Sequence, residues 1–194
     1  MADYHFVSTW EFATTPEQVW EFAGHPEKWM LFWPGLHDVR LLGGPGDGRV
    51  GSSYEFVFKS FLPFTLSLEG SVVESDPPNR MAIDTKGELE GRGTLEISAP
   101  RDGVTRSTFV WDTRTTIAWM NAAAPLLRGL FEWNHDFLMT KAGNGMSRMI
   151  GAPILRREDT GASLARALMP FVGIAGSIWL VRRARRLRAR TPDG

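Results

Sequence analysis

The feature that most limits the possible folds of this chain is a change in the spacing of its apolar residues. From about residue 38 to residue 116, apolar and polar side chains alternate between turns, which is typical of antiparallel strands with one wet face. From Ile117 to Ile150, apolar residues recur every three or four positions, which predicts one long helix with Pro125 as the place for a kink. A sheet with one apolar face and a single long helix to cover it is an α+β architecture.

One further strand and two short helical segments come before this run. Residues 4–13 alternate and predict a strand. The run Thr14-Thr15-Pro16-Glu17 predicts the start of a helix, because threonine is a good N-cap and proline fits the first turn. The aromatic stretch Trp29–Leu36 predicts a helical turn or a lid. With the strands that follow, we expect an antiparallel sheet of about seven strands.

Composition excludes several kinds of site. The chain has no cysteine, which excludes disulfides, thiolate metal sites and a cysteine nucleophile. With only four histidines we expect no metal centre, and no motif predicts a dinucleotide or another cofactor. Eight tryptophans and twelve phenylalanines, against two tyrosines, can line a large apolar space with few polar groups.

The zero net charge is the sum of two unlike parts. Residues 151–194 hold nine arginines and three acidic residues, a net charge of +6, so residues 1–150 have a net charge of −6. This asymmetry predicts an acidic domain over residues 3–150 and a basic tail over residues 151–194.

The tail combines an apolar stretch with an arginine block. Ala167–Val181 has no charged residue, but as a helix its length of about 22 Å is short of the roughly 30 Å of a bilayer core. The arginines that follow could hold the tail on an anionic membrane surface: Arg182, Arg183, Arg185, Arg186, Arg188 and Arg190. The alternative is that the apolar stretch docks on the domain or on a second subunit. We expect no nucleic-acid partner, because no aromatic interleaving or binding fold accompanies the block.

The first residues of the chain, Met1-Ala2-Asp3-Tyr4-His5, have neither a basic region nor an apolar region of a signal peptide. We therefore expect a cytoplasmic protein, peripheral to the inner face of the membrane where the tail makes contact.

The order of elements and several short runs resemble the START-like superfamily, also called SRPBCC or helix-grip. Within it, the chain is most similar to the polyketide cyclase/dehydrase and lipid-transport group, over roughly residues 3–150. The resemblance depends on the opening strand with Thr14–Trp20, on Pro26-Glu27-Lys28-Trp29, on the Thr105–Thr116 strand and on the Trp133–Met139 run of the helix. It implies a curved sheet that grips the long helix and encloses a hydrophobic cavity.

The resemblance also implies which residues border that cavity. On the sheet they are Phe56, Phe58, Phe64, Leu66, Met81, Phe109 and Trp111, with Tyr54 as a polar neighbour. On the long helix we expect Leu130 and Asn134 to contact a ligand. The tryptophan and phenylalanine side chains of Trp29, Phe32 and Trp33 either gate the cavity mouth or belong to the core.

Three residues are candidates for catalysis. His135 lies at the border of the apolar face of the helix, either as a general acid or base in the cavity or as a histidine bonded to a neighbour such as Asp136. Asp112 and Arg114 share one face of a strand, opposite Trp111. They either form a salt bridge on the outer surface or, on the inner face, anchor a ligand. Arg92, Asn134 and Tyr54 are the other polar groups that could orient a ligand.

These observations leave two functions open. The first is a carrier or sensor of a hydrophobic small molecule, a lipid or a polyketide-like compound, with membrane contact through the tail. The second is a polyketide cyclase, aromatase or dehydratase that acts in the same cavity.

Overall fold

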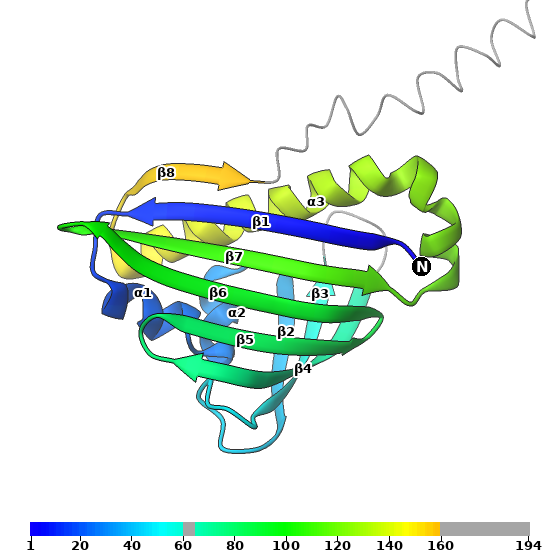
Figure 1. The fold of residues 1–194 in the computed structure, drawn as a ribbon, viewed down its shortest axis with the longest axis horizontal. Helices are drawn as coiled ribbons and strands as arrows, with labels where there is room; N and C mark the ends of the chain where they lie inside the picture. Colours follow the sequence, from blue (N-terminus) through cyan, green and yellow to red (C-terminus); the bar gives the residue numbers. More distant parts are fainter. Residues whose placement is uncertain (60–64, 160–194) are drawn as a thin grey trace, which may run out of the picture.

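The computed structural model describes residues 1–59 and 65–159. Figure 1 shows a curved sheet in front of one long helix, and the predicted α+β helix-grip architecture is confirmed. The elements in chain order are β1 (Asp3–Phe12), α1 (Pro16–Ala23), the 3₁₀ turn η1 (Pro26–Lys28), α2 (Trp29–Phe32), β2 (Leu36–Gly43), β3 (Ser53–Lys59), β4 (Thr65–Asp76), β5 (Arg80–Gly87), β6 (Leu89–Arg101), β7 (Val104–Thr115), α3 (Ala118–Ile150) and β8 (Ile154–Asp159).

The sheet is antiparallel throughout and has eight strands in the order β2-β3-β4-β5-β6-β7-β1-β8. The eighth strand comes from the segment that the sequence assigned to the tail. β8 pairs with β1, with Asp159 opposite Ser8 and Arg157 opposite Trp10. The strand adds its hydrogen bonds to the free edge of β1, so the folded unit includes Asp159.

β1 shows why the sheet has one buried face. Its even-numbered residues from Tyr4 to Phe12 are buried, while His5 and Thr9 on the other face are more exposed. Alternation in β1 is therefore as the sequence predicted, since side chains on a strand point to opposite faces in turn. β1 pairs along its whole length with β7, from Asp3 opposite Arg114 to Phe12 opposite Thr105.

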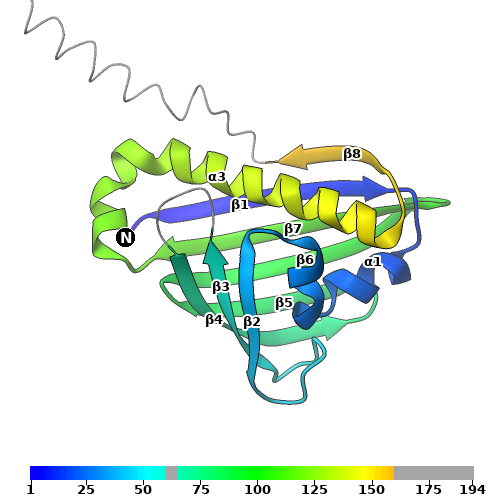
Figure 2. The same cartoon turned by 180° about the vertical axis from the view of Figure 1, so that it is seen from behind.

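Irregular pairings bend the sheet around its buried face. The register shifts between Val72 and Glu74 in β4, and again between Ser98 and Arg101 in β6. An extra residue on one strand increases the local twist and bends the strand. The result is a concave face, and α3 lies across it, as Figure 2 shows from behind.

α3 begins after Thr115 and ends at a glycine. Gly151 has a φ of +67°, and its N–H donates to the carbonyl of Ser147, which closes the last turn in the left-handed conformation that glycine tolerates. The sequence prediction of one helix over 117–150 therefore agrees with the structure, with Pro125 inside the helix.

The apolar residues of α3 do not form a single stripe that faces the sheet. Trp119, Leu126 and Phe137 have exposed fractions of 48%, 36% and 37%, whereas Phe131, His135 and other residues of the opposite face are buried. The helix has apolar side chains on both faces, so the three- and four-residue spacing identifies a helix without identifying its inner face.

The core between sheet and helix consists of two clusters of buried apolar residues. One lies around α1 and α2, with the C-terminal half of α3, and includes Trp29, Phe56 and Met146. The other lies around the start of β1, with the N-terminal half of α3, and includes Tyr4 and Phe131. The cavities described below lie along this interface.

Candidate functional site

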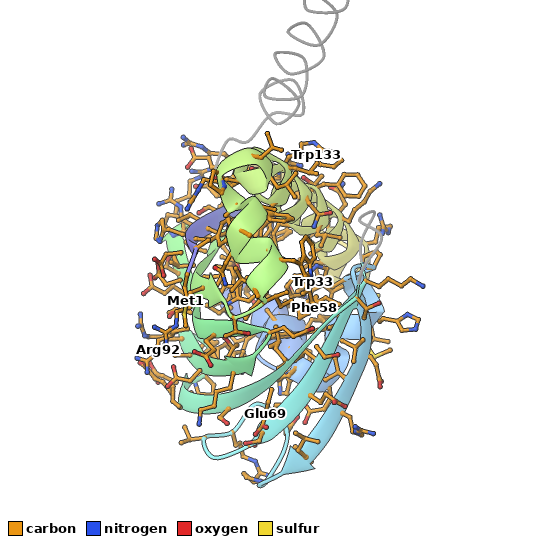
Figure 3. The ribbon with its side chains drawn as sticks, turned by 90° about the vertical axis from the view of Figure 1, so that its right-hand side faces the viewer. Met1, Trp33, Phe58, Glu69, Arg92 and Trp133 are labelled. Atoms are coloured by element: carbon orange, nitrogen blue, oxygen red, sulfur yellow. The ribbon has the colours of Figure 1, made fainter. Side chains whose placement is uncertain are left out.

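A cavity of about 100 Å³ lies beneath α3, where the two core clusters meet. One water molecule requires roughly 10–15 Å³ of such space, so the cavity can hold a small organic molecule. Figure 3 shows the labelled side chains of Trp33 and Phe58 beneath the helix. Six residues that the sequence proposed for ligand binding or catalysis line this cavity: Trp33, Phe58, Leu66, Trp111, Asn134 and His135.

Eight further lining residues were not among the sequence candidates: Tyr4, Phe6, Leu89, Thr113, Met120, Phe131, Leu138 and Met139. Two of them, Tyr4 and Phe6, belong to the alternating opening strand and could have been found from its position beside the long helix. Four others lie on α3 and depend on how that helix is rotated over the sheet, which the sequence pattern did not determine: Met120, Phe131, Leu138 and Met139.

A second, smaller cavity of about 60 Å³ lies toward α1 and α2. It shares Trp33 and Met139 with the first cavity, so these two side chains form the partition between them. Three proposed ligand-binding residues line this second space together with Trp33: Trp29, Phe32 and Phe109.

Four proposed ligand-binding residues line neither cavity: Tyr54, Phe56, Met81 and Leu130. Phe56 and Met81 are buried in the core cluster around α2, and Leu130 packs against the cluster around β1. Phe64 lies outside the described residues.

Tyr54 holds the loop between β2 and β3 in place. Its hydroxyl donates to Oε1 of Glu27 at 2.7 Å and accepts from the N–H of Gly48 at 3.1 Å. Burial, together with the hydrogen bond to Glu27, raises the pKa of Tyr54 to about 12. Its hydroxyl therefore fastens the loop between β2 and β3 to η1.

The other polar candidates on the sheet also lie outside the cavities. Arg114 pairs with Glu90 on the outer face at 3.0 Å, and Asp112 pairs with His5 at 2.6 Å. Arg92 is likewise exposed and bonds to Asp84. Alternation explains the placement, because Trp111 and Thr113 on the same strand face α3 and their neighbours must face away.

The cavity wall is almost entirely apolar, although several of its residues also carry a buried polar atom. Among the described residues, four buried side-chain atoms of the lining have no hydrogen-bond partner: the Tyr4 hydroxyl, Trp33 Nε1, Asn134 Oδ1 and His135 Nε2. A buried polar group left unpaired costs about 1–3 kcal/mol. Four other buried side-chain atoms of the described residues also lack a partner and lie outside this lining: Ser8 Oγ, Trp10 Nε1, Thr85 Oγ1 and Asp159 Oδ1.

His135 is the lining residue whose side chain ordinarily titrates near neutral pH, and its exposed fraction is 9%. Its ring stacks on Phe6, with centroids 4.0 Å apart, and lies 6.2 Å from the ring of Trp111. Burial lowers the pKa of His135 below its usual 6.5, so the ring is neutral at physiological pH. Nδ1 lies 3.5 Å from Oδ1 of Asp136, at the outer limit of a hydrogen bond.

A carboxylate can only accept a hydrogen bond, so this contact favours the hydrogen on Nδ1. Nε2 is buried and has no hydrogen-bond partner among the described residues. His135 thus lines the cavity and contacts Asp136 through Nδ1, while its role as a general acid or base stays a prediction.

Negative charge lies behind His135. The side chains of Asp136 and Asp159 are both largely buried, and Asp159 is paired with Arg157 at 2.8 Å. Burial raises the pKa of Asp159, the Arg157 guanidinium opposes that rise, and the Asp136 carboxylate adds to it.

Residues 4–143 match the family described as polyketide cyclase/dehydrase and lipid transport. The chain belongs to this family. The resemblance stated from the opening strand and the long helix is thereby confirmed. No curated protein sequence matches the chain.

Solved structures with the same fold include bacterial and plant members of the superfamily. A protein from Thermus thermophilus is 16% identical, with a TM-score of 0.64 over 76% of this chain and 97% of that chain. Ginseng major latex-like protein 151 from Panax ginseng is 10% identical, with a TM-score of 0.58 over 76% and 97%. Norcoclaurine synthase from Thalictrum flavum is 11% identical, with a TM-score of 0.54 over 77% and 94%. At these identities the likeness shows a shared fold.

The described residues contain neither a candidate metal site nor a candidate membrane-spanning helix. Residues 1–59 and 65–159 contain no group of three His, Asp or Glu side chains placed to bind a metal ion. No helix within these ranges has the length and apolar character that crossing a bilayer requires. The apolar stretch Ala167–Val181 and the arginines from Arg182 to Arg190, which the sequence associates with a membrane, lie outside the described residues.

Proposed function

We propose that the protein binds a hydrophobic small molecule in the cavity beneath α3 and acts as its carrier or sensor. The observation that supports this most is an apolar cavity of about 100 Å³ beneath α3. A hydrophobic wall with a few polar groups that fix orientation is the usual form of a small-molecule site.

The family supports the same function. Its description names lipid transport beside cyclase and dehydrase activity, and a lipid is an apolar ligand that this cavity would shield from water. Norcoclaurine synthase has been crystallised with dopamine and hydroxybenzaldehyde, which shows for that protein that the fold holds ring compounds.

The proposal includes delivery at a membrane through the tail. A block of six arginines over residues 182–190 provides positive charge for an anionic lipid surface, while the rest of the chain is acidic. In this proposal the domain is cytoplasmic and becomes peripheral to the membrane when the tail binds.

Catalysis in the same cavity is the second candidate, and His135 is the reason to keep it. His135 lines the cavity, and a neutral imidazole can accept a proton from a bound ligand. This would make the protein a cyclase, aromatase or dehydratase of a polyketide-like substrate, with His135 as the general base.

The test is native mass spectrometry of protein purified from its own host, followed by extraction and identification of the bound molecule. Leu138→Trp fills the cavity and should remove the adduct, while Leu126→Trp adds the same bulk on the exposed face of the same helix and should keep it. An adduct that survives Leu138→Trp would contradict the proposal.

A carrier and an enzyme can be distinguished by whether the protein converts the extracted molecule. Incubation of that molecule with fresh protein should return it unchanged from a carrier. From an enzyme it should give a product whose formation stops in His135→Leu.

A further inference from the structure

We propose that the segment Ala167–Val181 of the same chain packs along the outer face of α3 and runs antiparallel to it. The segment lies outside the described residues, and the inference assigns it to a surface that a ligand in the cavity does not touch. The arginine block that follows Val181 then remains available for an anionic lipid surface. The inference therefore goes beyond the proposed function and does not depend on the ligand.

The outer face of α3 carries a continuous apolar stripe. Its members alternate in spacing between four and three residues, which is the spacing with which one helix packs against another: Trp119, Ala123, Leu126, Leu130, Trp133 and Phe137. The exposed fractions of Trp119, Leu126 and Phe137 lie between 36% and 48%. Figure 3 shows Trp133 on the side of α3 that points away from Trp33 and Phe58. A contiguous apolar surface of this kind marks a docking site, whereas a single exposed apolar residue does not.

The segment Ala167–Val181 matches the stripe in spacing and in length. Leu168, Phe171, Ala175 and Ile178 are three, four and three residues apart, so a helix would present them on one face. Such a helix would be about 22 Å long, against roughly 28 Å for the stripe. Pro170 would lie in its first turn, where the missing N–H breaks no hydrogen bond of the helix.

The place where the described chain ends gives the direction of packing. β8 lies alongside α3 in Figures 1 and 2, and its last residue, Asp159, is close enough to Asp136 for the two charges to interact. The seven residues between Asp159 and Ala167 span at most about 29 Å. They reach Phe137, the neighbour of Asp136, easily, but Trp119 lies about 26 Å farther along the helix. The segment therefore enters at Phe137 and runs toward Trp119.

The short link also favours this occupant over a second copy of the chain. A segment tethered by a few residues has an effective concentration in the millimolar range at a surface within its reach, which exceeds micromolar concentrations of protein. Charge acts in the same direction, because residues 151–194 have a net charge of +6 and residues 1–150 one of −6. A bilayer is a poorer match, since its core is about 30 Å thick and the segment is shorter.

The experiment is disulfide trapping in the full chain, which has no cysteine of its own. When Leu168 lies opposite Phe137, the equal rise of the two helices brings Val181 beside Ala123. Under mild oxidation, the pair Ala123→Cys with Val181→Cys should form an intramolecular disulfide at least tenfold faster than the pair Ala123→Cys with Ala167→Cys. The second pair is the matched control, because it places the thiol at the other end of the segment, about 21 Å away.

A change in the stripe itself tests whether apolar packing holds the segment. Leu126→Glu, added to the first pair, should slow the disulfide severalfold, because the docked segment would bury the new carboxylate. Asn144→Glu adds the same charge at an exposed position of α3 beyond the stripe and should leave the rate unchanged. Rates are measured by non-reducing electrophoresis, with the linked peptides identified by mass spectrometry.

Other occupants of the stripe would give different results. A disulfide-linked dimer from the first pair would mean that a second copy covers the stripe and would overturn the inference. Equal rates in the two pairs, or a rate that Leu126→Glu does not change, would overturn it as well. If neither pair reacts, the inference is wrong. Protection of both thiols from a maleimide by vesicles of 70% phosphatidylcholine and 30% phosphatidylglycerol would then identify a bilayer as the occupant.

Discussion

At the contact between α2 and α3, replacing Gly145 by alanine has two opposite effects on stability: a gain in helix propensity and a steric overlap. A Cβ atom added at Gly145 would lie 1.8 Å from the carbonyl oxygen of Phe32 and 2.7 Å from its carbonyl carbon. A comfortable C···O contact is about 3.3 Å or more, so the two helices would have to separate by roughly 1.5 Å. The atoms in the way belong to the backbone, so no side-chain rotation can relieve the overlap.

The magnitude follows from the balance of these effects. Alanine in place of glycine inside a helix gains about 1 kcal/mol from helix propensity. Overpacking of a tight core contact costs about 1–3 kcal/mol and occasionally more, and here the displaced element includes a backbone carbonyl. We therefore expect Gly145→Ala to lower the free energy of unfolding by about 1–2 kcal/mol, although the same substitution in an exposed helix would raise it.

The assay is urea unfolding followed by tryptophan fluorescence, with Asn144→Ala as the control. Asn144 is the exposed neighbour of Gly145 on the same helix, so its replacement keeps the gain in propensity without the overlap. The urea concentration at the unfolding midpoint should fall for Gly145→Ala and rise slightly for Asn144→Ala. The dependence of the unfolding free energy on urea concentration should stay the same in both variants. If both midpoints rise together, the helices do not approach as closely as the structure shows.

Three other predictions concern single side chains. Because the pKa of His135 is lower in the folded chain than its unfolded 6.5, the unfolded chain binds the proton more tightly. Stability should therefore decline as the pH falls below about 6.5, and His135→Leu should flatten that slope in urea midpoints between pH 5 and 8. Tyr54→Phe should lose about 1–2 kcal/mol of stability, measured in the same way, because the Glu27 carboxylate and the β2–β3 loop lose a buried partner. Arg114→Ala should change stability by no more than about 0.5 kcal/mol and leave ligand binding unaltered, since its exposed pair with Glu90 lies outside the cavity.

The sequence predicted the architecture because the spacing of apolar residues within each segment shows whether it is a strand or a helix with one buried face. This spacing can be read from neighbouring residues alone. Alternation in residues 4–13 identified the inward side chains of β1, and the change of period at Ile117 identified α3. The eighth strand was missed because Ile154–Asp159 has four consecutive charged residues and no alternation. β8 lies at the sheet edge, where both of its faces tolerate charge.

The site could be predicted only in part, because it depends on the rotation of one helix. A shift in that rotation exchanges His135 and Phe137 between the inner and outer faces, and both faces of α3 contain apolar residues. The outward position of Asp112 and Arg114 follows from alternation alone once Trp111 is known to face the helix. Sequence reasoning stated that alternation but left the choice of inner face open.

The position of the cavity follows from what holds the other aromatic side chains in place. At the α2 end, Trp29 donates its indole N–H to the carbonyl of Ala23 at 2.9 Å and stacks on Phe56 at 5.4 Å. Tyr54 is held there by Glu27. These partners are specific and directional, so the aromatic groups at that end cannot relax into the space beneath the middle of α3. The larger of the two cavities therefore lies beside Trp33 and His135, and the smaller one remains between Trp33 and the packed groups of α1 and α2.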